Sequence, residues 1–354
     1  MKPDIKSLTF EELVLALTDL NQPSYRAKQL YDWMHVRLAV SYDDMTNIPK
    51  ALKSLLQENF QYTSLHQETV QCSALDGTRK YLFSLADGEC VESVFLPYKH
   101  GNSVCVSSQV GCRMGCKFCA STLDGLKRNL RAGEMLDQVY AITRQTGERI
   151  SNVVIMGTGE PLDNYDNVLR FIRMLSDEHG LHISQRNITL STCGLVPQIR
   201  QLAEENLQIT LALSLHAPTD EKRKQLMPVA YRYSLKEVMG VCRYYFEKTG
   251  RRLTFEYSLV SGSNDTKTDA MQLVRLLNGL PCHVNLIPVN PVAERGLKPS
   301  APASVHAFQK VLDQNGINVT IRREMGRDID GACGQLRHRR LQEMSEEDKQ
   351  FSET

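Results

Sequence analysis

The sequence lacks any hydrophobic run long enough to cross a membrane, because none approaches the ~18 apolar residues of a spanning helix. Residues 1–17 mix charged and apolar side chains, so we expect no secretory signal. The formal net charge of +1 argues against a uniformly basic surface. Without a secretory signal, the 10 cysteines indicate reduced thiols rather than a disulfide framework. We therefore expect a cytoplasmic protein that does not contact membranes.

Local basic clusters are present despite the balanced charge. They lie at residues 127–131, at Arg322-Arg323 and at residues 337–340. Each is compatible with a solvated face or with a nucleic-acid contact, and the pattern alone does not choose. The length of 354 residues and the hydrophobic content of 42% suit one large domain with a small one attached.

Three cysteines, Cys112, Cys116 and Cys119, form a C-x3-C-x2-C pattern in a loop after a predicted strand (Ser103 to Ser108). Three thiolates on one short loop can hold three corners of an iron–sulfur cube, which leaves the fourth iron open for chemistry. Structural zinc is the alternative. Zinc sites of that kind normally have four ligands and paired C-x2-C arms, and the sequence has no second arm. The loop therefore favours an open 4Fe–4S cluster.

Residues 1–62 show the pattern of three short helices. A capping box at Thr9 and Glu12 predicts the start of the first helix. Apolar residues at helical spacing predict the second over Ser24 to Leu38, and Pro49 suits the first turn of the third. Such a domain can simply cover the core or can bind RNA, and the sequence alone does not distinguish the two.

From Leu65 to Pro97 the apolar period changes to two. Asp76-Gly77 and Asp87-Gly88 predict turns that divide this stretch into three strands. On the third strand, Glu92 shares a face with apolar side chains, so we expect a raised pKa and a role as proton acceptor. A solvated strand edge is an equally good interpretation of the pattern.

After the cysteine loop, strand-like and helix-like runs alternate. Counted from the strand before the loop, they make six βα units and predict a parallel sheet, although periodicity does not say whether the sheet closes. The later predicted strands are Asn152 to Met156, Ile188 to Thr192, Ile209 to Leu215, Leu253 to Leu259 and His283 to Ile287. Predicted helices include Met135 to Thr146, Val196 to Glu205, Leu235 to Lys248 and Ala270 to Leu277.

Polar residues follow several of these strands at their carboxyl ends, where parallel α/β folds build active sites. Each alone has an ordinary explanation, such as a turn glycine or a buried core histidine. Their shared position beside the cysteine loop favours a binding site, and their oxygens and amide suit a ligand with an ammonium, a carboxylate and a ribose. The candidates are Gly157, Gly159, Glu160, Ser191, Ser214, His216 and Asn290.

A second glycine-rich stretch, residues 326–336, contains Cys333 in a predicted mobile loop. A buried cysteine in a turn explains its composition equally well. Beyond Gln342 the chain is acidic and polar, so we expect a frayed tail. The predicted division is a helical domain (1–62), a β-meander (63–100), a core that ends in the C-terminal cysteine loop (101–336) and a polar tail (337–354).

The string G-C-R-M-G-C-K-F-C-A-S-T, with Phe118 before the last cysteine, resembles the radical S-adenosylmethionine (SAM) signature. More narrowly, it resembles the RlmN/Cfr family of RNA adenine methyltransferases. The C-terminal string D-I-D-G-A-C-G-Q-L is similar to that family's D-I-D-A-A-C-G-Q-L, and the resemblance runs roughly from Tyr25 to Leu336. It implies a partial (β/α)6 radical SAM barrel with an N-terminal RNA-binding domain. The departures from the family pattern, Thr158, Cys193 and Gly331, are minor.

The resemblance also implies a role for each candidate residue. The cysteine triad would bind the 4Fe–4S cluster and Glu92 would accept a proton. Cys333 would carry a methyl group, and Cys105, seven residues before the triad, would attack Cys333 and leave a disulfide. Two SAM molecules would be used per turnover. SAM would contact Gly159, Glu160, Ser191, Ser214, Leu215, His216 and Asn290.

The implied activity is methylation of adenosine C2 in 23S rRNA and in the tRNA anticodon loop. The enzyme would act as a monomer with an external electron donor such as flavodoxin. A second branch of the family methylates C8, but the strings Y-R-A-K-Q-L-Y-D-W-M and A-S-T-L-D-G-L favour the C2 branch. Two other classes remain as alternatives. A radical SAM activase of proteins would not need Cys105, Cys333 or Glu92, and a zinc-containing RNA-binding module would not need Gly159-Glu160.

Overall fold

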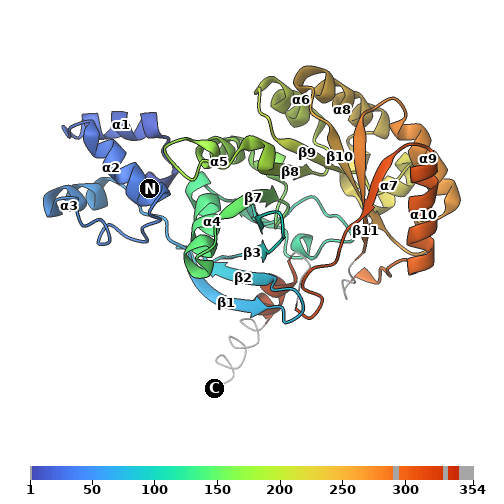
Figure 1. Ribbon diagram of the computed structural model, residues 1–354, viewed down its shortest axis with the longest axis horizontal. Coiled ribbons are helices and arrows are strands. Elements are labelled where there is room, and N and C mark those ends of the chain that lie inside the picture. Colours follow the sequence, from blue (N-terminus) through green and yellow to red (C-terminus); the bar gives the residue numbers. More distant parts are fainter. Residues whose placement is uncertain (1, 290–294, 330–333, 343–354) are drawn as a thin grey trace.

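The computed structural model describes residues 2–289, 295–329 and 334–342. Helices α1 (Phe10–Asp19), α2 (Tyr25–His35) and α3 (Lys50–Asn59) form a group at one end of the molecule (Figure 1). The capping box of Thr9 and Glu12 is confirmed. Pro49 is the N-cap residue of α3, one position before the expected first turn.

The β-meander follows this helical group. Strands β1 (His66–Cys72), β2 (Arg79–Ser84) and β3 (Cys90–Leu96) pair antiparallel in chain order, as predicted. The two turns need their glycines, because Gly77 and Gly88 have φ values of 74° and 83°, a region that side chains with a Cβ disfavour. The meander therefore arises from local turn chemistry.

The meander continues into a larger sheet. β3 pairs antiparallel with β4 (Asn102–Cys105), and β4 begins a parallel series. The ten strands lie in the order β1-β2-β3-β4-β7-β8-β9-β10-β11-β12, so the sheet is open at both edges within the described residues. The parallel members after β4 are β7 (Ile150–Ile155), β8 (Ile188–Thr192), β9 (Thr210–Ser214), β10 (Leu253–Leu259), β11 (Cys282–Pro288) and β12 (Asn318–Ile321).

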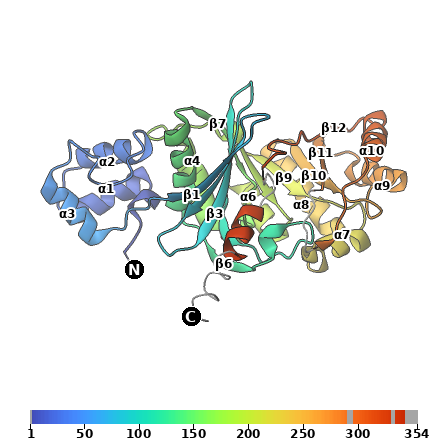
Figure 2. The same cartoon turned by 90° about the horizontal axis from the view of Figure 1, so that it is seen from below.

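This architecture agrees with the expected partial barrel, and all six predicted core strands are present. The strand β12 was not predicted, because four residues are too few to show a period. Helices cover the outer face of the parallel strands (Figures 1 and 2). They are α4 (Ala132–Thr146), α5 (Tyr165–Ser176), α6 (Val196–Glu204), α7 (Asp220–Leu226), α8 (Leu235–Thr249), α9 (Lys267–Leu277) and α10 (Pro302–Gln314).

A small hairpin, also absent from our predictions, frames the cysteine loop. Its strands are β5 (Gln109–Gly111) and β6 (Leu126–Asn129), and the short 3-10 helix η2 (Ala120–Thr122) lies between them. Gly111 has φ of 74°, and a Cβ there would collide with the carbonyl oxygen of Gly125. The hairpin therefore fixes both ends of the segment that contains the three cysteines.

Residues 335–342 are helical and lie beside β3 and β6 (Figure 2). The segment expected as a polar tail thus begins with ordered helix, and Arg337 within it is buried rather than solvated. Its Nε donates to the carbonyl oxygen of Cys90, and its other nitrogens pair with Glu89 and Asp124. Across the described ranges, no helix has the length and apolar character needed to span a bilayer.

Candidate active site

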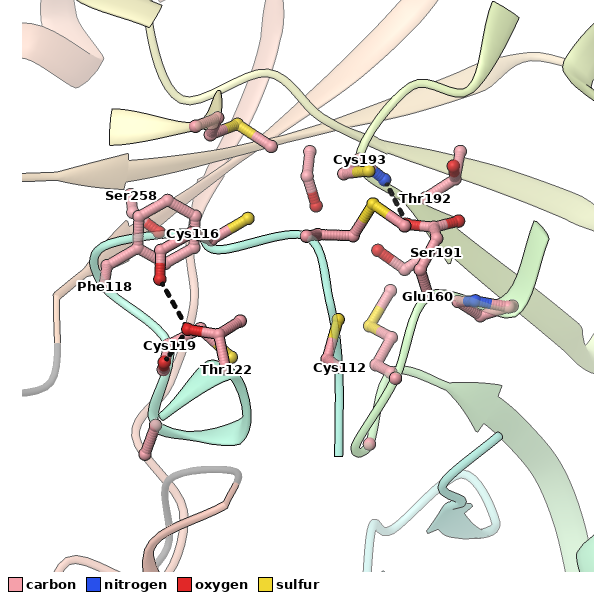
Figure 3. A pocket seen from close by; sticks show the side chains of 18 of the residues that line it. Cys112, Cys116, Phe118, Cys119, Thr122, Glu160, Ser191, Thr192, Cys193 and Ser258 are labelled. Atoms are coloured by element: carbon pink, nitrogen blue, oxygen red, sulfur yellow. Dashed lines mark hydrogen bonds between the residues drawn. The ribbon is translucent and has the colours of Figure 1, made fainter. Parts of the chain in front are cut away.

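A pocket lies where the cysteine loop meets the carboxyl ends of the parallel strands (Figure 3). All three cysteines of the triad line it, as predicted. Of the predicted strand-end residues, Gly157, Gly159, Glu160, Ser191 and Ser214 also line it. Ser258, at the end of β10, was missed, although the same strand-end rule would have found it. The polar or small lining residues from the strand ends are Gly157, Gly159, Glu160, Ser191, Thr192, Cys193, Ser214 and Ser258.

Hydrogen bonds to backbone carbonyl groups hold the cysteine loop in place. Thr122 Oγ1 donates to the carbonyl oxygens of Cys116 and Cys119, at 3.2 and 2.9 Å (Figure 3). Burial raises the pKa of Cys112 to about 12 and that of Cys116 well above its ordinary range. Metal binding is therefore coupled to loss of their protons.

The residues present fit an iron–sulfur cluster better than a zinc ion. Within the described ranges, no three His, Cys, Asp or Glu side chains are placed to share one metal ion. In a cube each cysteine binds a different iron, so three sulfurs around a common space are suitable even though they do not converge on one point. Three thiols would hold three of the four irons of such a cube and would leave the fourth without a protein ligand.

Glu160 is buried, and its carboxylate caps the 3-10 helix η3 (Pro161–Asn164). The two carboxylate oxygens accept hydrogen bonds from the backbone nitrogens of Leu162 and Cys193, at 3.1 and 2.7 Å. Burial raises the pKa of Glu160, and these hydrogen bonds oppose that rise. Cys193 thus contributes its backbone amide to the site.

Gly159 allows this loop to approach β5 closely. Its φ is 111°, and a Cβ at this position would lie 2.7 Å from Cβ of Gln109. The side chain of Gln109 accepts from the backbone nitrogen of Glu160 at 2.8 Å. Gln109 was missed by the sequence analysis, because no motif or strand-end position marks it.

Leu215 and His216 are buried and do not line the pocket, so their direct contact with a ligand stays a prediction. Nδ1 of His216 accepts from the backbone nitrogen of Ser258 at 2.9 Å, which places the ring proton on Nε2. Burial lowers the pKa of His216 to about 3, so the ring is neutral at physiological pH. The ring packs edge-on against Phe118 of the cysteine loop.

Glu92 lies on β3 and is only 3% exposed, which excludes a solvated strand edge. The expectation of apolar surroundings is also wrong for its carboxylate, which lies 3.1 Å from the buried Nζ of Lys80. The same carboxylate accepts from the backbone nitrogens of Gly334 and Arg337, both at 2.7 Å. Lys80 was missed, because the pairing of β2 with β3 is not readable as a motif.

Gly334 brings the C-terminal motif to the cysteine loop. A Cβ on Gly334 would lie 2.5 Å from the backbone nitrogen of Ser121, in the helix that follows Cys119. Cys105 is buried at the end of β4, opposite Val94 of the neighbouring strand β3. Cys333 and Asn290 lie outside the described residues, so their predicted roles stay predictions.

Two family models match this chain. Residues 106–276 match the family model described as "Radical SAM superfamily". Residues 4–61 match the model "Ribosomal RNA large subunit methyltransferase N-terminal domain".

The relatives are similar over nearly their whole length. A protein of Lachnospira eligens named "Probable dual-specificity RNA methyltransferase RlmN" is 60% identical over 98% of this chain and 99% of its own. A protein of Clostridium perfringens with the same name is 54% identical over 94% and 96%. The crystal structure of a radical SAM methyltransferase from Sphaerobacter thermophilus superposes with a TM-score of 0.91 at 43% identity, and the match covers 94% and 98% of the two chains. The chain therefore belongs to the RlmN family of radical SAM methyltransferases.

Proposed function

We propose that this chain methylates C2 of an adenosine in 23S rRNA and in the tRNA anticodon loop, with Cys333 as the methyl carrier. Its relatives are named as dual-specificity RNA methyltransferases. The observation that carries the proposal is the 2.7 Å hydrogen bond from Gly334 to Glu92. This bond joins the C-terminal cysteine motif to the proposed proton acceptor, beside the loop of the cluster cysteines.

In this proposal Cys112, Cys116 and Cys119 hold a 4Fe–4S cluster and SAM occupies the adjoining pocket. When bound, these groups supply the radical chemistry that an unreactive aromatic carbon requires. Two SAM molecules are consumed per turnover, one as methyl donor and one as radical source. The proposed SAM-binding residues are Gly159, Glu160, Ser191, Ser214, Leu215, His216 and Asn290.

The chain's own residues then act in order. The sulfur of Cys333 takes a methyl group by displacement, and this carbon, after losing a hydrogen atom, bonds to C2 of adenine. Glu92 removes the proton from C2. The thiolate of Cys105 attacks the sulfur of Cys333, so that an S–S bond forms as the S–C bond breaks. The released methylene carbon takes up a proton and becomes the methyl group of the product, and the one electron that started the turnover returns to the external carrier. Cys105 is buried at the end of β4, where solvent does not reach it freely.

We further propose that the enzyme is a cytoplasmic monomer that takes electrons from an external donor such as flavodoxin. The target base must leave its stack to reach a pocket at the strand ends, as base-directed enzymes generally require. The cysteine pair needs reduction before the next turnover.

The proposal is tested by replacing each cysteine of the pair and incubating the anaerobically reconstituted protein with RNA. Cys105→Ala blocks only the release step, so RNA should accumulate in covalent attachment to the protein. Cys333→Ala lacks the methyl carrier and should give neither attachment nor product. Attached RNA is measured by denaturing electrophoresis, and product by nucleoside mass spectrometry, in which wild type should yield 2-methyladenosine.

Cys72→Ala is the matched control, because Cys72 is exposed on β1, and it should turn over like wild type. A Cys105→Ala protein that turns over freely with no attached RNA would overturn the two-cysteine mechanism. Formation of 8-methyladenosine as the main product would instead assign the chain to the C8 branch.

A further inference from the structure

Arg223, on α7, is a fully buried cation with an unpartnered nitrogen. Its side chain is 0% exposed. Nη2 donates to the carbonyl oxygen of Cys193 at 2.7 Å, and Nε donates to that of Leu215 at 3.3 Å. Nη1 is also buried and has no hydrogen-bond partner in the part of the chain that the structure describes. The two bonds formed go to neutral carbonyl groups.

No carboxylate forms an ion pair with this guanidinium within residues 2–289, 295–329 and 334–342. Asp220 is the acidic residue near enough to interact electrostatically, and its Oδ1 accepts from the backbone nitrogen of Leu235. A buried charge without a counter-ion is strongly unfavourable. The environment of Arg223 therefore calls for a negative group that binds nearby.

The other groups that interact electrostatically with Arg223 include Cys116 and Cys193. Cys116 belongs to the cluster triad, and Cys193 lines the same pocket. Gly194 gives the guanidinium room, since a Cβ there would lie 3.2 Å from Nη2. The buried cation is thus hydrogen-bonded to a residue of the pocket wall and interacts electrostatically with one cysteine of the triad.

A purely structural role explains only part of this arrangement. The hydrogen bonds to Cys193 and Leu215 tie together the segments that follow β8 and β9. Linking these segments requires two hydrogen-bond donors but no permanent positive charge, and Nη1 takes no part in it. A cube held by three thiolates is anionic, and each added electron makes it more so. A neighbouring cation therefore stabilises the reduced state more than the oxidised state.

We propose that Arg223 is the built-in countercharge of the cluster held by Cys112, Cys116 and Cys119, and that it makes the cluster easier to reduce. The inference rests on the proposed function for the presence of a cluster. Arg223 is a positioning residue that acts through the cluster and touches no reacting atom. Its charge reduces the electrostatic cost of the electron that starts each turnover.

The test is the reduction of the reconstituted cluster in the absence of RNA and SAM, followed by electron paramagnetic resonance in a redox titration. R223M keeps the length of the side chain and removes the charge. At a fixed potential, the ratio of reduced to oxidised cluster should fall at least about tenfold, which is about 59 mV for a one-electron couple. R223K keeps the charge and should restore most of that ratio.

R251M is the matched control. Arg251 donates to the carbonyl oxygen of Ile209 at the opposite end of the strands, so its loss should leave the titration unchanged. If R223M does not hold four irons, R223Q replaces it, since glutamine can donate one hydrogen bond without charge. If the cluster assembles in wild type and in R223K but in neither R223M nor R223Q, the cluster needs a cation at this position.

Two results would overturn the inference. One is an intact cluster in R223M or R223Q that titrates like wild type. The other is failure of R223K and of both neutral variants to assemble the cluster, which would make the guanidinium purely structural. Neither result affects the methyl-carrier proposal, because wild-type formation of 2-methyladenosine is measured separately. Conversely, the titration of R223M can still be shifted relative to that of wild type even if wild type makes no methylated adenosine.

Discussion

Glu92 holds two segments of the chain together. Its carboxylate accepts from Gly334 and Arg337 and pairs with Lys80, so it holds residues 334–342 against the meander. Replacing Glu92 therefore changes the docking of the C-terminal segment together with any proton transfer. For this reason the cysteine variants separate the steps of the reaction more clearly than Glu92→Gln does.

A single methyl group at Gly159 should distort the pocket. Gly159→Ala places a Cβ 2.7 Å from that of Gln109 at a φ of 111°, where side chains with a Cβ are strained. We expect the free energy of unfolding to fall by about 1–3 kcal/mol. Because Glu160 is displaced with the loop, SAM binding measured by calorimetry should also weaken.

Gly240→Ala is the control for that substitution. Gly240 lies in α8, and a Cβ there meets nothing within 4 Å. Alanine should stabilise the helix by about 0.5–1 kcal/mol, because it restricts the unfolded chain. Equal unfolding midpoints in urea for the two alanine variants would contradict the close approach of Gly159 to β5.

Among the elements, the short 3-10 helix η1 (Ile5–Ser7) connects the N-terminal helices to the core through a buried ion pair. Nζ of Lys6 lies 2.8 Å from Oδ1 of Asp137 on α4, and both side chains are 0% exposed. The other oxygen of Asp137 accepts from the backbone nitrogen of Leu65, at the start of the meander. One carboxylate thus links three parts of the chain.

Lys6→Met should weaken the link between η1, α4 and the start of the meander and so lower the free energy of unfolding. The change leaves the carboxylate of Asp137 buried without its main cation, and breaking a buried pair in this way costs about 3–5 kcal/mol. The free energy of unfolding from urea denaturation measures the loss. Arg37→Met is the matched control, because Arg37 is 56% exposed where it pairs with Asp32, and its loss should cost less than about 1 kcal/mol. Similar losses in both variants would refute the linking role.

Elements set by local chemistry could be predicted from the sequence, and those set by distant partners could not. The capping box at Thr9 and the hairpin turns at Gly77 and Gly88 depend on neighbouring residues, and all three are present. The ion pair of Glu92 with Lys80 depends on strand register, which carries no motif. The burial of Arg337 depends on a contact with Cys90 across 247 positions, so composition suggested a polar tail instead.

At the scale of the whole molecule, a buried histidine makes stability depend on pH. His35 lies between the N-terminal helices and α4, where Nδ1 is 2.8 Å from the hydroxyl of Tyr140. Burial lowers the pKa of His35 to about 3, and the charge of Lys6 adds to this effect. The unfolded chain therefore binds a proton below pH about 6.5 that the folded chain takes up only near pH 3. The free energy of unfolding therefore decreases as the pH is lowered through that window.

His35→Phe should flatten this dependence. Between pH 7.5 and 5, wild type should lose about 2 kcal/mol through His35 alone, and the variant should lose that much less. Urea denaturation at several pH values gives the slope. His306→Phe, at an exposed position on α10, should keep the wild-type slope. Identical slopes for wild type and His35→Phe would show that His35 is not the source.

The strand order has a consequence for how the molecule is made. Each strand of the ten-stranded sheet pairs with the one before it in this series, so the sheet can grow at one edge while the chain is still being synthesised. The surroundings of the proposed proton acceptor do not form in that order, because Glu92 accepts a hydrogen bond from Gly334, which is synthesised 242 positions later. A nascent chain that already contains all ten strands of the sheet therefore still lacks the segment that contacts Glu92. We expect the nascent chain to remain inert until the segment that reaches Glu92 has emerged.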